Sequence, residues 1–402
     1  DALSKTAAIS QVTTGPSVSK PVIRGLSYNR VVTLVDGARQ EGQQWGDEHG
    51  IEADMFSTGR VEVLRGPAAL LYGSDAIGGV INILDPLSPV EGQIRGEVLT
   101  NYATNNGLTG NSAMLEGNSN GFVWRGRASY KNAFAYNTPA GRIDNSAFNE
   151  TNFSGLAGFN KKWGYAHIDF ATFNNQLGIP GHAHGEESEQ EEHAEDEFIT
   201  DSRSRSVELP QQRVQHYKLA LNSNVLLGEN RLRSTIAYQN NRRREFEESG
   251  SIPALFMDLK TYSYDLKYYS KPTAGWEPVL GVAGMFQDNN NRAEERLIPD
   301  YRASDVGIFA FLKKSWTKTS INFGARYNYR HINGTATEEE GEIKFPEFKN
   351  NFSNLSGAVG LTYEFNSRLT MKANVGKAFR APNIAELGST GVHEGTFRYE
   401  IG

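Results

Sequence analysis

Three histidines stand within a run of carboxylates between residues 178 and 198, GIPGHAHGEESEQEEHAEDEF. The first two are separated by one residue, so in an extended segment both imidazoles project from the same side. Imidazole and carboxylate together suit zinc and related divalent transition metals. The candidate metal ligands are His182, His184, Glu186, Glu187, His193, Glu195 and Asp196. Such a composition cannot bury a core, and a solvated acidic loop or a weak calcium site would share it.

A second group of carboxylates with one histidine lies in QQWGDEHGIEAD, near the start of the chain. Oxygen ligands and an imidazole fall within one short expected loop, and Gly46 and Gly50 would let that loop curl around an ion. The candidate ligands are Asp47, Glu48, His49, Glu52 and Asp54. The alternative is a solvated turn, or an Asp–His contact that only maintains the shape of the loop.

The composition limits the elements that can position these groups. The chain has 402 residues and no cysteine, which excludes disulfides, thiolate zinc sites, iron–sulfur clusters and cysteine nucleophiles. The net charge of −6 provides no basic surface for nucleic acid. No apolar run approaches the roughly 18–20 residues of a membrane helix. A membrane barrel stays open as a fold class, because its strands expose only every second side chain to lipid.

Strict alternation of apolar and polar residues dominates the chain after residue 89. In GFVWRGRASYK, Phe122, Trp124 and Tyr130 fall on one face, while Arg125 and Arg127 fall on the other. About 13 complete strands and the start of another are expected between residues 92 and 402. Aromatic residues gather at the strand ends, and one face is apolar and the other polar. This pattern is typical of an outer-membrane barrel with a polar lumen.

The connections between the expected strands are alternately short and long. The short ones are NSNG, NKKWG, GEN, KPTAG, WTKT and NSR, and the long ones centre on residues 134–150, 175–212, 244–258, 288–303, 332–350 and 381–397. Outer-membrane barrels keep short turns on the periplasmic side and long loops outside the cell. The His-rich stretch is therefore expected to be the third extracellular loop.

The segments before residue 89 are shorter and more varied. PVIRGLSYNRVVTLVDGARQ predicts two strands, and ADMFSTGRVEVLRGPAALLYGSDAIGGVINIL predicts a short helix, a strand, a helical turn and another strand. Glycines in the second segment permit tight turns and close backbone approach, and its charged residues are candidates to pair with a polar barrel wall. The glycines are Gly66, Gly73, Gly78 and Gly79, and the charged residues are Arg60, Glu62, Arg65 and Asp75.

Residues 60–83, RVEVLRGPAALLYGSDAIGGVINI, closely resemble the plug signature of TonB-dependent outer-membrane receptors. PVIRGLSYNRVVTLVDGARQ resembles the segment upstream of that signature, and GKAFRAPNIAEL, residues 376–387, resembles a motif late in the barrel. The resemblance covers essentially the whole chain. It implies an all-β membrane protein, with a large antiparallel transmembrane β-barrel and an N-terminal α+β plug inside the lumen.

The domains expected from this resemblance are a plug, residues 1–88, and a barrel, residues 89–402. Barrels of the family have about 22 strands and about 14 are expected here, so the C-terminal strands are expected to be missing. The TonB box and the start of the plug are expected to be missing as well. The first ten residues lack a charged segment followed by an apolar one, so a signal peptide is either absent or already removed.

The resemblance implies active import across the outer membrane of a Gram-negative bacterium. It implies outer-membrane lipid, the TonB–ExbB–ExbD complex and a metal ion or chelate as partners, and no catalytic cofactor. Zinc receptors of the family look similar in their acidic, His-rich loops. The leading hypothesis is therefore that zinc, or a related divalent metal, is captured by residues 178–198 and held by Asp47, Glu48 and His49.

Other substrates and other classes of protein remain as alternatives. Haem is the first, because His393 follows an FRAP sequence, as a haem-ligating loop histidine does in haem receptors of the family. Ferric siderophores are the second, because arginines expected in the lumen could bind them, although solvating the lumen or pairing with the plug explains these arginines equally well. They are Arg125, Arg127, Arg326 and Arg330. A passive porin lacks a plug signature, and no hydrolase motif indicates an enzyme.

Overall fold

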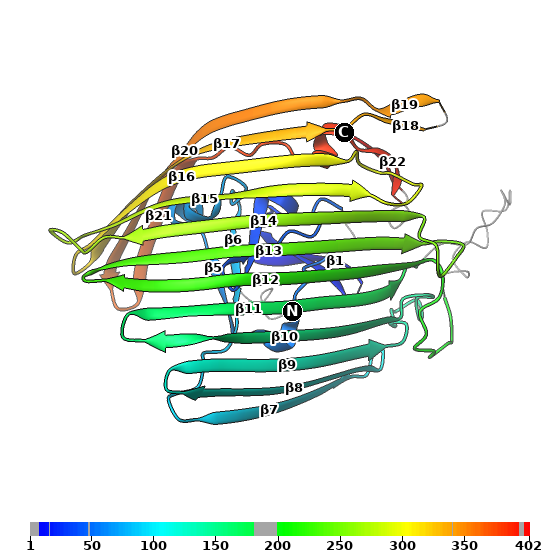
Figure 1. Cartoon of the computed structure of the whole chain (residues 1–402), viewed down its shortest axis with the longest axis horizontal. Helices are drawn as coiled ribbons and strands as arrows, with labels where there is room; N and C mark the ends of the chain where they lie inside the picture. The colour runs from blue at the N-terminus through cyan, green and yellow to red at the C-terminus, as the bar shows by residue number, and fades with distance from the viewer. Residues whose placement is uncertain (1–7, 16, 47–48, 181–198, 340, 394–397) are drawn as a thin grey trace.

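The computed structural model describes residues 8–15, 17–46, 49–180, 199–339, 341–393 and 398–402. Thirteen strands pair antiparallel in one sheet, in chain order except for a hairpin inserted after β17 (Figure 1). The strands are β7 Ile94–Ala103, β8 Leu108–Ser119, β9 Phe122–Ala133, β10 Phe148–Lys161, β11 Gly164–Gly178, β12 Gln211–Leu227, β13 Asn230–Phe246, β14 Leu255–Tyr269, β15 Trp276–Asn291, β16 Tyr301–Ser315, β17 Thr319–Gly334, β20 Phe348–Asn366 and β21 Leu369–Lys377. This confirms the expected large antiparallel membrane sheet.

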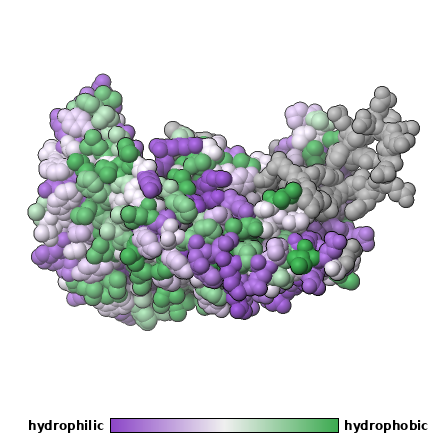
Figure 2. All heavy atoms as spheres, turned by 90° about the horizontal axis from the view of Figure 1, so that it is seen from above, coloured by the Kyte–Doolittle hydropathy of each residue, from purple (hydrophilic) through white to green (hydrophobic). Residues whose placement is uncertain are grey.

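The two faces of the sheet differ because successive side chains of a strand point in opposite directions. On β13, Gln239, Asn241 and Arg243 point inward and are buried, whereas Ile236 on the other face is half exposed. The outer surface carries many hydrophobic side chains, as the space-filling view shows (Figure 2). The alternation read from the sequence therefore separates a polar interior from an apolar exterior. No helix among the described residues is long and apolar enough to span a membrane.

A small plug packs against the inner face of this sheet, and in Figure 1 it lies behind the strands. Its four-stranded sheet has the order β4-β3-β6-β5, and β3 and β6 are parallel. Apolar strands form its core, in which Val80 and Ile81 are fully buried. The elements are β1 Ile9–Gly15, β2 Val18–Ile23, η2 Tyr28–Arg30, β3 Val31–Val35, β4 Ala38–Arg39, η3 Met55–Ser57, β5 Arg60–Leu64, η4 Gly66–Tyr72 and β6 Gly79–Leu84.

The expected order of helix, strand, helical turn and strand in the plug signature is confirmed, with 3-10 helices as its helical parts. A proline in the first turn suits the start of η4, because its fixed φ matches a helix and its missing N–H has no partner there. Gly79 begins β6 with φ +139°, and a Cβ at this position would lie 2.7 Å from the Leu64 carbonyl oxygen. Only glycine fits this close approach of β5 and β6 without strain.

Short turns join the strands at one end of the sheet and longer connections join most of them at the other, as the sequence predicted (Figure 1). The long-connection end also carries the hairpin β18 Thr337–Glu339 and β19 Glu342–Phe345, the helix α1 Ile384–Gly388 and the strand β22 Thr390–His393. Strand β23, Arg398–Ile401, stands where a fourteenth barrel strand was expected. It pairs with β22 and not with the sheet.

Candidate substrate site at the plug apex

The loop between β4 and η3 carries the first candidate metal ligands, and it reaches the long-connection end of the sheet. Trp45, in this loop, packs against an apolar cluster that includes Leu255 and Leu297, which lie at that end of the wall. The amide of Gln43 donates to the Asn289 side chain at 2.9 Å, two residues before β15 ends. The loop is therefore the apex of the plug on the side expected to face the outside of the cell.

His49 is the one histidine of the apex loop, and its side chain is completely buried. Its Nδ1 contacts the carbonyl oxygen of Gln43, and the edge of its ring packs on Trp45 with ring centroids 5.0 Å apart. An Nδ1 contact to a backbone carbonyl fixes the orientation of the imidazole and is typical of histidines that bind a metal through Nε2. The predicted ligands Asp47 and Glu48 lie outside the described residues.

Glu52, also predicted as a ligand, lies in a polar cluster between the apex loop and the barrel wall. Its carboxylate is 2.7 Å from Nδ1 of His216 on β12 and 2.7 Å from a guanidinium nitrogen of Arg243 on β13. Asn241 donates to it as well. These side chains are nearly inaccessible to solvent, so their polar groups depend on one another. The observed role of Glu52 is to connect the plug to two barrel strands.

Asp54 has a comparable role at the end of the same loop. One carboxylate oxygen caps η3 by accepting a hydrogen bond from the Phe56 amide at 2.9 Å. The other accepts from the Ser129 hydroxyl of β9 at 2.8 Å. Glu52 and Asp54 therefore contact different strands of the wall, and neither lies beside His49 in a ligand cluster. Within the described part of the chain, no group of three His, Asp or Glu side chains is placed to hold a metal ion.

Charged side chains on the plug also pair with the arginines of the lumen. The Asp75 carboxylate lies 2.7 Å from Arg39 of the plug and 3.0 Å from Arg330 of β17. Burial alone would raise the pKa of the Asp75 carboxyl, but Arg330 and Arg39 outweigh it and hold that pKa well below its usual range. In contrast, Arg60 and Glu62 pair with each other at 3.1 Å on an exposed part of the plug.

A further charged group lies nearer the short-turn end. Arg125 of β9 binds Asp85 at 3.2 Å, just after the last plug strand, and also pairs with Glu116. Lys218 of β12 lies 3.5 Å from Asp36 of the plug. Burial and then the nearby Asp36 carboxylate raise the pKa of Asp85 to about 7. Arg125 and Arg330 therefore pair with carboxylates of the plug, which is one of the two explanations given for the lumen arginines.

The segment after the FRAP sequence folds back over the plug apex. Arg380 pairs with Glu386 at 2.6 Å, and the Asn383 and Glu386 side chains form a capping box that starts α1. Ile384 of α1 belongs to the same apolar cluster as the residues around Trp45. His393 ends β22, and its backbone is described but its side chain is not. The haem candidate and the apex loop therefore meet at the same end of the molecule.

A small cavity separates the apex loop, the barrel wall and the start of α1. Its volume is about 60 Å³, and its lining includes Arg39, Glu41, Gln43, Trp45, Tyr301, Arg330 and Arg380. Sites for drug-sized ligands typically have volumes of about 300–1,000 Å³. In this conformation the space has room for a few waters, and a bulky chelate would require the apex or α1 to move.

The His-rich, acidic stretch of residues 178–198 is hydrogen-bonded at or beside both of its ends to neighbouring segments. The Ile179 amide donates to Pro210, and the Thr200 amide donates to Arg142 in the connection between β9 and β10. Residues 181–198 lie outside the described residues, so the predicted ligands His182, His184, Glu186, Glu187, His193, Glu195 and Asp196 are not assessed by the structure.

Sequence reasoning left out the partners that the wall contributes to the plug. His216 and Arg243 were not among the candidates, although both are central to the contacts of Glu52. Their inward orientation follows from the alternation along β12 and β13, and this was the only signal available in the sequence. Their distance from the apex loop depends on the way in which the plug sits in the barrel.

Two family models match the chain: the TonB-dependent receptor plug domain over residues 1–80 and the TonB-dependent receptor-like β-barrel over residues 54–402. A probable TonB-dependent siderophore receptor, PirA of Acinetobacter baumannii, is 23% identical over 396 residues, which cover 90% of this chain and 52% of the relative. A hemin receptor of Yersinia pestis is 52% identical over 60 residues, 15% of this chain and 9% of the relative.

The structure of the copper transporter OprC has a TM-score of 0.78 and 15% identity, and covers 94% of this chain and 59% of its own. The chain spans about half, or less, of the length of the curated relatives it matches. Relatives of this kind are outer-membrane proteins, and the present chain has their barrel sheet and their plug. The chain therefore belongs to the family of TonB-dependent receptors of the Gram-negative outer membrane.

Proposed function

We propose that this chain is part of a receptor that imports a transition metal, with zinc or a related divalent ion, free or as a weak chelate, as its substrate. The observation that supports this proposal most is the position of the apex loop, which contains His49. This loop lies at the end of the sheet from which the acidic stretch also leaves, because Ile179 and Ile199 flank that stretch there. A capture segment and a holding loop on the same side are what import from outside requires.

The two segments have different tasks in this proposal. Residues 182–197 are rich in carboxylates and imidazoles, so they concentrate cations electrostatically near the mouth of the barrel. Asp47, Glu48 and His49 then hold the ion at the plug apex, where the imidazole of His49 is already oriented by its contact with the Gln43 carbonyl oxygen. Glu52 and Asp54 connect the plug to the barrel wall and do not bind the ion, because their carboxylates already contact His216 and Ser129 of the wall.

Release of the ion requires the plug to rearrange. We assign the energy for this step to the TonB–ExbB–ExbD complex, since the chain belongs to the family that is named for TonB. A plug of residues 1–88 and a barrel of residues 89–402 are the matching domain assignment. In this proposal the protein is a transporter with no catalytic cofactor.

Haem or a ferric siderophore is the second candidate substrate. The observation that favours it is the packing of α1 against the apex cluster, because this packing brings the segment that ends at His393 near the plug. The named relatives include a hemin receptor and a siderophore receptor. A ligand of that size would have to displace α1 from the apex.

Binding measurements on the complete receptor, purified in detergent, distinguish these substrates. Zinc, copper, nickel and haem are titrated by calorimetry into the wild type, His49→Gln, His393→Ala and a variant that lacks residues 182–197. His331→Gln serves as the matched control, since His331 hydrogen-bonds Asn351 on the face of β17 opposite to Arg330 and Ile332, which line the cavity beside the apex loop.

Zinc affinity is expected to fall at least about tenfold in His49→Gln and to be unchanged in the control, since changing even an outer-shell partner of a bound metal costs about 10- to 100-fold in affinity. Deletion of residues 182–197 is expected to slow zinc uptake at low zinc concentrations. Tight binding of haem that depends on His393, together with no binding of zinc, would replace the first candidate with the second.

A further inference from the structure

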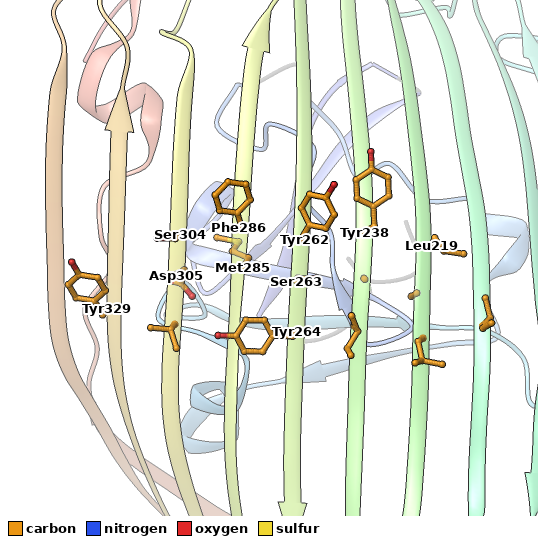
Figure 3. Close-up of a pocket in the computed structure, with 16 residues that line it drawn as sticks. Leu219, Tyr238, Tyr262, Ser263, Tyr264, Met285, Phe286, Ser304, Asp305 and Tyr329 are labelled. Atoms are coloured by element: carbon orange, nitrogen blue, oxygen red, sulfur yellow. The ribbon is translucent and has the colours of Figure 1, made fainter.

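An apolar groove runs across the outer face of the sheet, over strands β11 to β17. Its volume is about 680 Å³. Tyr238, Tyr262 and Phe286 form one of its borders, and they lie in a row on adjacent strands (Figure 3). The apolar lining includes Ile168, Leu219, Leu221, Ile236, Tyr264 and Val306. These side chains are on the face opposite to the buried lumen residues, so the groove faces the membrane.

Ser304 is a small residue that leaves part of this face open. It lies next to Phe286 in the strand register and lines the groove. Gly284, between Tyr264 and Val306, is instead covered by the Tyr264 ring, because a Cβ there would lie 2.7 Å from the Tyr264 hydroxyl oxygen. A large side chain at position 304 would fill the space beside Phe286.

Two arginines that form no ion pair with any described residue lie beyond one end of the groove. Arg213 of β12 and Arg244 of β13 are direct partners in the strand register, and two like charges in such a pair repel each other. Among the described residues neither arginine has a carboxylate within ion-pair distance. Each guanidinium lies over a ring, Phe246 for Arg213 and Phe256 for Arg244, and Arg244 also donates to the uncharged Gln215 side chain at 2.6 Å.

Further cations surround this pair on the same face and at the same end. Lys260, Arg242, Arg292 and Arg302 lie between the arginine pair and the aromatic row or beside it, whereas Asp258 and Asp288 are the carboxylates among them. Six cations thus face two carboxylates, although the chain as a whole has a net charge of −6. The hydroxyl groups of Tyr238 and Tyr262 point toward this end in Figure 3, as expected at a membrane–water interface.

We propose that this groove and the arginine pair form a specific binding site for an anionic lipid of the outer leaflet that carries a phosphomonoester group. The acyl chain would lie in the groove and the phosphate would lie against Arg213, Arg242 and Arg244. Charge complementarity selects this occupant, because a phosphate would relieve the repulsion between the facing arginines and guanidinium binds it in bidentate fashion. An apolar groove below a basic cluster matches the two ends of such a lipid.

Lipid binding to the purified receptor tests this proposal. The protein is exchanged into detergent micelles that contain either bisphosphorylated lipid A or phosphatidylcholine, and bound lipids are counted by native mass spectrometry. The first variant carries Arg213→Gln, Arg242→Gln and Arg244→Gln. The matched control carries Lys162→Gln, Lys318→Gln and Arg368→Gln, three exposed cations in the short turns at the opposite end. Circular dichroism verifies that each variant keeps its β-sheet.

We expect the arginine variant to bind lipid A about a hundredfold more weakly, from the contribution of each basic residue near a charged lipid surface. The control should bind as the wild type does, and phosphatidylcholine should bind weakly to all of them. Ser304→Phe, which fills the groove and leaves every cation in place, should also weaken lipid A binding. Equal binding by the wild type and the arginine variant, or an equal loss in the control, would overturn the proposal.

Discussion

The contact between Glu52 and the wall makes the most direct test of how the plug is held. In Glu52→Gln the carboxylate becomes an amide, so the buried Arg243 guanidinium loses the negative charge that lies 2.7 Å away. The side chains of Glu52 and Arg243 are 3% and 1% exposed, so water cannot replace the lost partner. Removing one member of a buried ion pair costs about 3–5 kcal/mol. Arg243 retains the Gln212 side chain at 2.5 Å, so the lower end of this range is expected.

Urea unfolding of the plug measures this cost under conditions in which the barrel stays folded. Trp45 reports on the apex loop, and Trp45→Phe identifies its share of the fluorescence among the five tryptophans of the chain. Glu62→Gln is the matched control, because Glu62 pairs with Arg60 on an exposed surface where such pairs contribute about 0–1 kcal/mol. The same titration in the presence of zinc tests a ligand role for Glu52. If Glu52 only connects the plug to the wall, zinc should raise the urea midpoint of the wild type and of Glu52→Gln by the same amount.

Combining Glu52→Gln with Arg243→Met removes both charges, and we expect it to recover most of the lost stability. The recovery follows because no buried charge is then left without a partner. The reasoning would be refuted if Glu52→Gln were no more harmful than Glu62→Gln. A double variant less stable than the sum of its two single variants would refute it too.

Three further predictions concern the plug and are measured by the same unfolding titration. Asp75→Asn should destabilise the plug at pH 7, and the difference in stability from the wild type should shrink as the pH falls below about 4. The lowered pKa of Asp75 stabilises the folded plug fully above the pKa of an unfolded aspartate, and this stabilisation is lost as the carboxylate becomes protonated. A constant difference down to pH 3 would contradict this. Asp85→Asn should stabilise the plug at pH 8 and not at pH 4. Burial and then Asp36 raise the pKa of Asp85 to about 7, so the cost of ionising Asp85 in the folded plug grows from about pH 4 and is complete above about pH 7. No gain at pH 8 would count against this reasoning. Gly79→Ala should lower the stability of the plug by about 1–3 kcal/mol at any pH, because φ there is +139° and the new methyl group would meet the Leu64 carbonyl oxygen. A urea midpoint equal to that of the wild type would exclude the close approach.

Much of the fold could be predicted from the sequence because the relevant patterns are local. A strand alternates with a period of two residues, so Arg125 and Arg127 could be assigned to the lumen without any knowledge of the plug. The lengths of the connections assigned the end at which the acidic stretch leaves the sheet. The glycines of the plug signature indicated close backbone approach, and Gly79 shows it.

The candidate site could be predicted only in part. The apex loop was found from its residue types, but Glu52 and Asp54 were grouped with His49 because they are near it in sequence. The structure directs their side chains to different strands of the wall, one to His216 and the other to Ser129. Side chains a few residues apart in an irregular loop have no fixed relative direction. Spacing alone therefore could not separate metal ligands from residues that connect the plug to the wall.

The sequence by itself determined the alternating strands, the plug signature and the family, since each is written in short, continuous segments. Only the tertiary structure decided which residues meet across the lumen, as Glu52 meets Arg243 over a separation of 191 residues and Asp75 meets Arg330 over 255. It also decided that Arg213 faces Arg244 above an apolar groove. The physical reason is register: the partner of a side chain depends on how many strands and the plug are aligned together, and no single segment contains that information.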